Sequence, residues 1–216
     1  MGNQLKNLGS EKLVNDLLAA GNRRKFSPGE SVFDQGDRAD FLPVVLSGRV
    51  KIYRFLTPGK EVIINVFDEG EVFAIPPVLD GKGYPASAVA LDETELLMVS
   101  RNRFLNLLNK SEEFSKLVMS RMSGLLRETT RSIENLANGS PEERIANILL
   151  WLAEKEGTSD PVTISLRRQD IAQIAGLATE TTIRTIRKLA EDGIVSIVKG
   201  KIILDERRKL EVFLKA

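Results

Sequence analysis

The sequence predicts an α+β protein: a jelly-roll β-barrel, then one long helix, then a small helical domain that ends in a β-hairpin. Three observations support this order. Short β-branched runs alternate with turn dipeptides over residues 23–100, a helical pattern without proline covers residues 111–138, and two short helical patterns and a hairpin pattern fill residues 168–204. We therefore expect three parts, over residues 1–110, 111–138 and 139–216.

The first part begins with a predicted helix over residues 3–20, in which five leucines fall on one side: Leu5, Leu8, Leu13, Leu17 and Leu18. After Arg23 the apolar runs become short and lie between turn signals such as Pro28-Gly29 and Pro58-Gly59. The predicted strands are Val44–Leu46, Val50–Tyr53, Val62–Phe67 and Leu96–Val99. Many short strands at near-regular spacing are typical of a barrel or jelly roll. A short helix over residues 102–108 is expected to follow.

The long helix starts at Ser111, a good N-cap residue with two acidic residues in the turn behind it, and stops at Gly139. Its apolar positions step by three or four residues, which is close to a coiled-coil seam. They are Val118, Met122, Leu125, Thr129, Ile133 and Leu136. We expect this seam to join two copies of the chain. The alternative is that the helix packs on its own barrel, and different parts of the helix can do each.

The last part contains two predicted helices joined by a tight turn at Gly176, because glycine tolerates the positive φ that ends a helix. A helix starting at Ser140-Pro141 and a strand over residues 161–166 precede them. In the second helix of the pair, three residues form one apolar face: Thr182, Ile186 and Leu189. The opposite face presents Thr179, Glu180, Ile183, Arg184 and Arg187. This layout predicts a helix-turn-helix.

Glu180 and Arg184 lie one helical turn apart and so point the same way. A carboxylate accepts a hydrogen bond from cytosine N4, an arginine fork matches guanine O6 and N7, and Ile183 suits a thymine methyl group. The hairpin around Lys199-Gly200 predicts a wing, with Lys199 and Lys201 placed for phosphate contact. The alternative is a plain αα-hairpin carrying an i,i+4 salt bridge.

Composition excludes several classes of function. The net charge is +1, so a DNA-binding surface must come from local clusters, including Arg168 and Arg187, and not from bulk charge. The chain has no cysteine and no histidine, which removes disulfides, thiolate zinc sites, histidine-based catalytic triads and histidine-ligated haem. We expect no catalytic residue and no metal site. Without a signal peptide or an 18-residue apolar run, we expect a cytoplasmic protein with no membrane partner.

Several motifs in this order resemble the bacterial Crp–Fnr family of transcription regulators. In the barrel they are residues 26–40, 45–53 and the Gly70-Glu-Val-Phe turn; in the last part they are residues 169–176 with Glu180, Thr181 and Arg184. The resemblance implies a cyclic-nucleotide-binding-like barrel and a homodimer that binds a palindromic site in double-stranded DNA. It also implies that Glu180 and Arg184 read bases, that Thr179 and Thr181 contact the backbone or flanking positions, and that RNA polymerase is a candidate partner.

The chain departs from the family in both domains. Ala178 stands where the family usually has the capping serine, Thr179 where it has arginine, and Ile183 where serine or glycine is common. In the barrel, Ile75 and Ala86 occupy the positions of the glutamate and arginine that hold cyclic AMP, so we expect a different ligand. The candidate effector residues are Phe73, Ile75, Lys82, Tyr84 and Ser87. They suit a small apolar or aromatic effector, or an anion reached by Lys82; the alternative is a filled core.

Four functions therefore compete, and no cofactor is assigned. The first is a DNA-binding regulator whose barrel binds a small effector other than cyclic AMP. The second is a constitutive regulator with a degenerate pocket. The third is a haem-based gas sensor, which would need an uncommon iron ligand in a chain without histidine or cysteine. The fourth, an enzyme on a cupin-like barrel, lacks the histidines that hold its metal.

Overall fold

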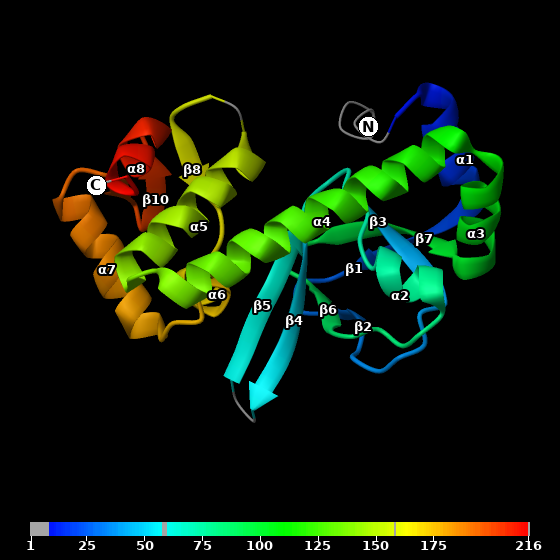
Figure 1. The fold of residues 1–216 in the computed structure, drawn as a ribbon, viewed down its shortest axis with the longest axis horizontal. Helices are drawn as coiled ribbons and strands as arrows, with labels where there is room; N and C mark the ends of the chain where they lie inside the picture. The colour runs from blue at the N-terminus through cyan, green and yellow to red at the C-terminus, as the bar shows by residue number, and fades with distance from the viewer. Residues whose placement is uncertain (1–8, 58–59, 158, 216) are drawn as a thin grey trace. The chain divides into compact units, whose positions relative to one another are not determined.

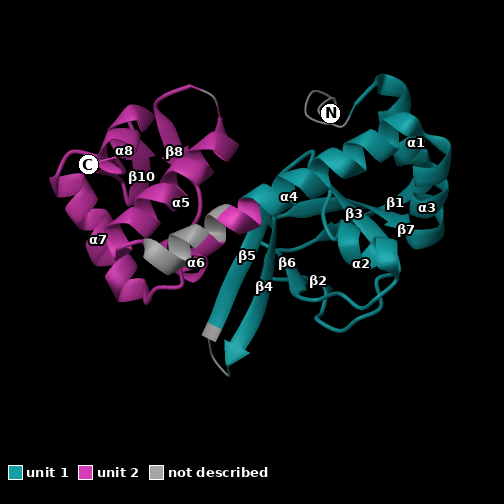
Figure 2. Ribbon diagram, viewed as in Figure 1, with its two compact units in different colours: residues 1–127 teal, residues 128–216 magenta. Residues whose placement is uncertain are grey.

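The computed structural model describes residues 9–57, 60–157 and 159–215. The chain divides into two compact units, Met1–Arg127 and Glu128–Ala216, and the boundary falls inside the long helix α4 (Glu112–Asn138) (Figure 2). Within the described residues, no helix is both long and apolar enough to cross a bilayer.

Unit 1 is built on two antiparallel sheets of three and four strands, in the orders β1-β7-β3 and β2-β6-β4-β5 (Figure 1). Residues from both sheets share one apolar core, as expected for a jelly roll. The elements are α1 (Glu11–Ala20), β1 (Gly21–Phe26), β2 (Ser31–Phe33), β3 (Phe41–Ser47), β4 (Val50–Thr57), β5 (Lys60–Phe67), α2 (Ile75–Asp80), β6 (Ser87–Ala90), β7 (Thr94–Ser100) and α3 (Arg101–Lys110).

The four predicted strands are present as parts of β3, β4, β5 and β7, and the short helix as part of α3. The first helix is shorter than predicted. It begins at Glu11, where the Ser10 side chain accepts a hydrogen bond from the Leu13 amide, and it buries Leu13 and Leu17. Leu5 and Leu8 lie outside the described residues. The Glu113 carboxylate of α4 also accepts hydrogen bonds from the Ser10 amide and hydroxyl, which anchors the start of α1.

Helix α4 starts as predicted, because the Ser111 hydroxyl accepts a hydrogen bond from the Phe114 amide. Its 27 residues span about 40 Å. The predicted seam needs a correction at its first position: Val118 is 5% exposed and belongs to the core of its own barrel, against which Met122 also packs. Of the other predicted positions, Leu125 is half-buried, Thr129 and Ile133 are exposed, and the Leu136 side chain lies outside the description. The exposed apolar stripe instead repeats every seven residues, at Met119, Leu126 and Ile133.

Unit 2 contains α5 (Pro141–Glu156), β8 (Val162–Ile164), α6 (Arg168–Ala175), α7 (Thr179–Glu191), β9 (Ser196–Val198), β10 (Lys201–Leu204) and α8 (Arg207–Phe213). Ser140 caps α5 in a capping box with Glu143, and Pro141 takes the first helical position. The three short strands form one antiparallel sheet in the order β8-β10-β9. Helix α8, which buries Leu210, has no counterpart among the predicted elements.

Candidate nucleic-acid interface

The turn between α6 and α7 is set by Gly176, which adopts a left-handed conformation with φ 64°. The amides of Gly176 and Leu177 both donate to the carbonyl oxygen of Ala172, so the last turn of α6 is closed without a side-chain cap. Ala172 itself is 1% exposed, and its small side chain lies in the packed region between the helices. The local sequence therefore folds into the predicted helix-turn-helix.

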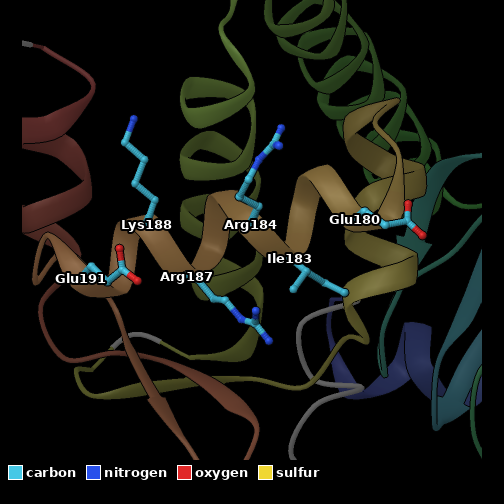
Figure 3. A pocket seen from close by; sticks show the side chains of 6 residues that line it. All are labelled: Glu180, Ile183, Arg184, Arg187, Lys188 and Glu191. Atoms are coloured by element: carbon cyan, nitrogen blue, oxygen red, sulfur yellow. The ribbon is translucent and has the colours of Figure 1, made fainter.

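One face of α7 is anchored in the domain core. The side chains of Thr182, Ile186 and Leu189 are fully buried, as predicted, and Thr185 is buried with them. The outer face is an open hollow lined by Glu180, Ile183, Arg184, Arg187, Lys188 and Glu191 (Figure 3). Since the inner face fixes the rotation of the helix, the outer residues are held in a defined direction.

The outer side chains diverge into groups in Figure 3. Glu180 lies at the N-terminal end of the helix, Arg184 points to one side with Lys188, and Ile183 points to the other side with Arg187. Glu180 and Arg184 are exposed, and the structure of the described residues shows no hydrogen bond or ion pair on either side chain. The i,i+4 salt bridge of the alternative interpretation is therefore not formed.

Lys188 is the one basic residue of this hollow with an ion pair to another helix among the described residues. Its Nζ atom lies 3.1 Å from Oε1 of Glu142, in the first turn of α5. The hydrogen bond from Lys188 lowers the pKa of Glu142 below its usual value, with a smaller electrostatic contribution from Arg184. The pairing of Glu142 with Lys188 was not predicted, because two residues 46 positions apart leave no local pattern in the sequence.

The wing turns at Lys199 and Gly200, which have φ values of 48° and 79°. Positive φ at both positions is typical of the tight turn that joins twisted antiparallel strands. Lys199 and Lys201 are exposed at the tip, and Nη1 of Arg168 donates a 2.7 Å hydrogen bond to the carbonyl oxygen of Gly200. Three of the predicted phosphate-contact residues are thus brought to one place.

The N-terminus of α7 is capped weakly. Ala178 occupies the N-cap position, and no side chain there accepts a hydrogen bond from the helix amides. Thr179 and Thr181, the predicted flanking contacts, are both half-buried on the first turn.

In the barrel, the candidate effector residues lie mostly in a filled aromatic core. Phe73, Ile75 and Tyr84 are each less than 5% exposed. The Tyr84 ring stacks on Phe33 with 3.7 Å between ring centroids, and its hydroxyl donates a 2.7 Å hydrogen bond to the carbonyl oxygen of Phe41. Burial raises the pKa of the Tyr84 hydroxyl above its usual range.

The two remaining candidates do not add a charged group to this core. The side chain of Lys82 is 82% exposed and pairs with Asp80 at 3.4 Å, so it does not lie with the buried residues. Ser87 is half-buried and its hydroxyl accepts a hydrogen bond from the Gln35 amide. Ala86, at the position of the family's arginine, is 3% exposed. The described residues also contain no cluster of acidic side chains able to hold a metal ion.

A barrel followed by a long helix and a winged helix-turn-helix is the architecture of a DNA-binding regulator. Residues 23–111 match the cyclic nucleotide-binding domain family, and residues 143–213 match the Crp-like helix-turn-helix domain family. The chain is 31% identical over 189 residues to the cyclic AMP receptor protein of Thermus thermophilus, covering 88% of this chain and 86% of that protein. It belongs to the Crp–Fnr family of transcription regulators.

Other relatives agree with this assignment. The nitrogen fixation regulation protein FixK of Rhizobium meliloti is 28% identical over 200 residues, covering 93% of this chain and 88% of that protein. The solved structure of FixK2 from Bradyrhizobium japonicum has the same fold, with a TM-score of 0.81 at 22% identity over 89% of this chain and 96% of that one. The catabolite activator protein of Thermus thermophilus gives a TM-score of 0.56 at 29% identity, over 99% of both chains.

Proposed function

We propose that this regulator binds a palindromic DNA site as a homodimer and reads it with Glu180 and Arg184. The observation that carries the proposal is the state of these two side chains. Both are exposed on the outer face of α7, free of intramolecular hydrogen bonds and ion pairs among the described residues, while the inner face of the helix is buried. An acid and a guanidinium group presented in this way match cytosine N4 and guanine O6 and N7.

The remaining contacts divide by chemistry. Ile183 lies between the two readers in the sequence, points to the side of α7 opposite Arg184 (Figure 3), and suits a thymine methyl group. Phosphate and flanking contacts suit the threonines of the first turn, Thr179 and Thr181. They also suit Arg187 and the wing lysines Lys199 and Lys201. Such contacts set the register of the protein on the duplex and leave base discrimination to the central residues.

The homodimer is supported by the exposed stripe on α4. Met119, Leu126 and Ile133 are 67%, 69% and 63% exposed, and their seven-residue spacing is that of one coiled-coil position. A symmetric pairing along this stripe buries the same residues of both copies. Two recognition helices related by that symmetry match two half-sites about one helical turn of DNA apart. A DNA target also places the protein in the cytoplasm, with RNA polymerase as a further partner.

We infer that the barrel does not bind cyclic AMP. Ile75 and Ala86 are buried at the positions where the family's cyclic-nucleotide binders carry charged anchors, and neither can pair with a ribose hydroxyl or a cyclic phosphate. For a barrel that does take an effector, the apolar Phe73 and Ile75 favour a small, mainly apolar or aromatic molecule. The stacked pair Phe33 and Tyr84 favours a second candidate, a constitutive regulator whose barrel is filled by its own side chains. Melting-temperature shifts on addition of candidate ligands, and DNA binding by the ligand-free protein, separate the two.

The test is selection of a site from a random DNA pool, followed by competition binding with single-base variants. Glu180→Ala and Arg184→Ala are each expected to reduce discrimination at one base pair per half-site by about 5- to 150-fold, the equivalent of about 1–3 kcal/mol. Glu191→Ala is the matched control, since it removes a charge from the far end of the same face. Unchanged base discrimination in both reader variants would refute the assignment.

A further inference from the structure

The outer strand of the wing, β9, has little packing to hold it. Strand β9 has three residues and lies at the edge of its sheet, and two of its side chains, Ile197 and Val198, are 38% and 50% exposed. Its pairing with β10 extends over three residue pairs only. Strand β10 is held by its pairing with β8 and by the buried Ile202 and Leu204, so β9 and the turn are the parts of the wing whose position depends on further contacts.

Arg168 supplies such a contact to the tip. Its guanidinium group donates a 2.7 Å hydrogen bond to the carbonyl oxygen of Gly200, 32 residues away and one residue from each of Lys199 and Lys201. Arg168 is the first residue of α6, and α6 is fixed in the core through the buried Ile171. A charged donor makes a hydrogen bond roughly twice as strong as a neutral one. The bond therefore connects the rigid helix pair to the otherwise loosely held turn.

We propose that Arg168 is a positioning residue that acts on DNA through the wing. By holding the Gly200 carbonyl, it fixes Lys199 and Lys201 at one distance from the recognition helix, so that both ammonium groups meet phosphates when α7 enters the major groove. This inference rests on the proposed DNA-binding function. It differs from a simple phosphate contact by Arg168, because the wing lysines then contribute only while Arg168 is present.

The hydrogen bond can be tested in the free protein, without DNA. Arg168→Ala is expected to raise amide hydrogen exchange in a peptide covering residues 194–204, whereas exchange in α6 and α7 stays unchanged. Arg167→Ala is the matched control: Arg167 is an exposed neighbour of the same charge, and its side chain makes no hydrogen bond or ion pair among the described residues. Equal protection of the wing in wild type and Arg168→Ala overturns the proposal.

The consequence for DNA binding is measured as the salt dependence of affinity for a selected site. Four proteins are compared: wild type, Arg168→Ala, Lys199→Ala/Lys201→Ala and the triple variant. Each lost phosphate contact reduces the slope of log K against log salt by about 0.9. If Arg168 acts through both lysines, the slope is smaller by about 1.8 in all three variants than in the wild type. Between 50 and 200 mM salt, each variant then loses about ten times less affinity than the wild type loses.

Independent contacts give a different pattern. Arg168→Ala then loses a slope of only about 0.9, equivalent to about 3.5-fold over the same salt range, and the triple variant loses about 2.7. That additive result overturns the proposal even if the hydrogen exchange changes. Failure of the DNA-binding proposal itself is recognised separately, because the wild-type protein then binds no duplex while the exchange experiment still reports on the bond from Arg168 to the wing.

Discussion

Glu142→Gln tests whether an acidic residue on α5 restrains the DNA contacts of α7. The Glu142 carboxylate holds the Lys188 ammonium group at 3.1 Å, and the two side chains are 29% and 59% exposed. A pair this exposed contributes about 0.2–1 kcal/mol to stability. Because Lys188 lowers the pKa of Glu142, this contribution is present above the usual pKa of a glutamate and is lost as the pH falls through the lowered one. The variant therefore remains folded at neutral pH.

The expected effect on DNA is larger than the effect on stability. In the wild type, Glu142 competes with phosphates for Lys188. Once the carboxylate is neutralised, Lys188 is available to one phosphate, which adds about 0.9 to the slope of log K against log salt. Between about 50 and 200 mM salt, the variant then loses about 3.5 times more affinity for a non-specific duplex than the wild type loses. At about 50 mM salt, the variant binds this duplex more tightly than the wild type does.

The assay is fluorescence anisotropy with a labelled duplex of arbitrary sequence at four salt concentrations. Glu191→Gln removes a like charge from the hollow that contains Lys188 without releasing a lysine, and so controls for the general electrostatic field. Lys188→Met is expected to match wild type in slope and to abolish the effect of Glu142→Gln in the double variant. If Glu142→Gln steepens the slope equally in the Lys188→Met background, Lys188 is not sequestered and the reasoning fails.

Three further variants test individual features of the structure. Ala74→Gly is expected to stabilise unit 1 by roughly 0.5–1 kcal/mol in chemical denaturation, because Ala74 adopts φ 58°, where glycine is unstrained. Equal or lower stability of the variant would show that the turn carries no strain. Ala178→Ser is expected to add about 1 kcal/mol to unit 2 by capping α7, measured in the same way, and no gain would mean that the first turn is satisfied otherwise. Leu126→Glu is expected to weaken dimerisation at least about 100-fold in sedimentation, since it removes two apolar contacts per dimer. Ser120→Glu, at an exposed position about 100° around the helix from Met119, is expected to leave dimerisation unchanged. A dimer insensitive to Leu126→Glu would place the interface elsewhere.

The elements that sequence analysis identified are those with local signals. Ser111, Ser140-Pro141 and Gly176 each mark a helix end by their own chemistry, and the structure places helix boundaries at all three. Strand β1 carried no such signal, because its residues Asn22–Lys25 are polar and exposed and it is an edge strand paired with β7 alone. Helix α2 was hidden by two prolines that follow a left-handed alanine, a combination that indicates a turn in isolation.

The same distinction applies to the candidate site. The outer face of α7 from Glu180 to Arg187 was predictable, because residues three and four apart share a helix face whatever surrounds them. The long-range contacts of Lys188 and Arg168 were not, since their partners are 46 and 32 residues away. Val118 shows what the spacing of apolar residues cannot predict. Helix α4 has apolar residues on two adjoining faces, so its sequence fits more than one seam. Only the packing of the folded protein decides which of the two faces the barrel covers.

These contacts suggest how a domain with almost no net charge gains specificity for DNA. Non-specific affinity grows with the number of phosphates that free cations neutralise, whereas base discrimination depends on a few oriented groups. Here Lys188 is held by an acid, while Glu180 and Arg184 carry no intramolecular hydrogen bond or ion pair among the described residues. The folded domain thus restrains one cation that would bind any duplex and leaves free the two groups proposed to read sequence. Releasing Lys188 should therefore tighten non-specific binding more than specific binding and lower the ratio between them.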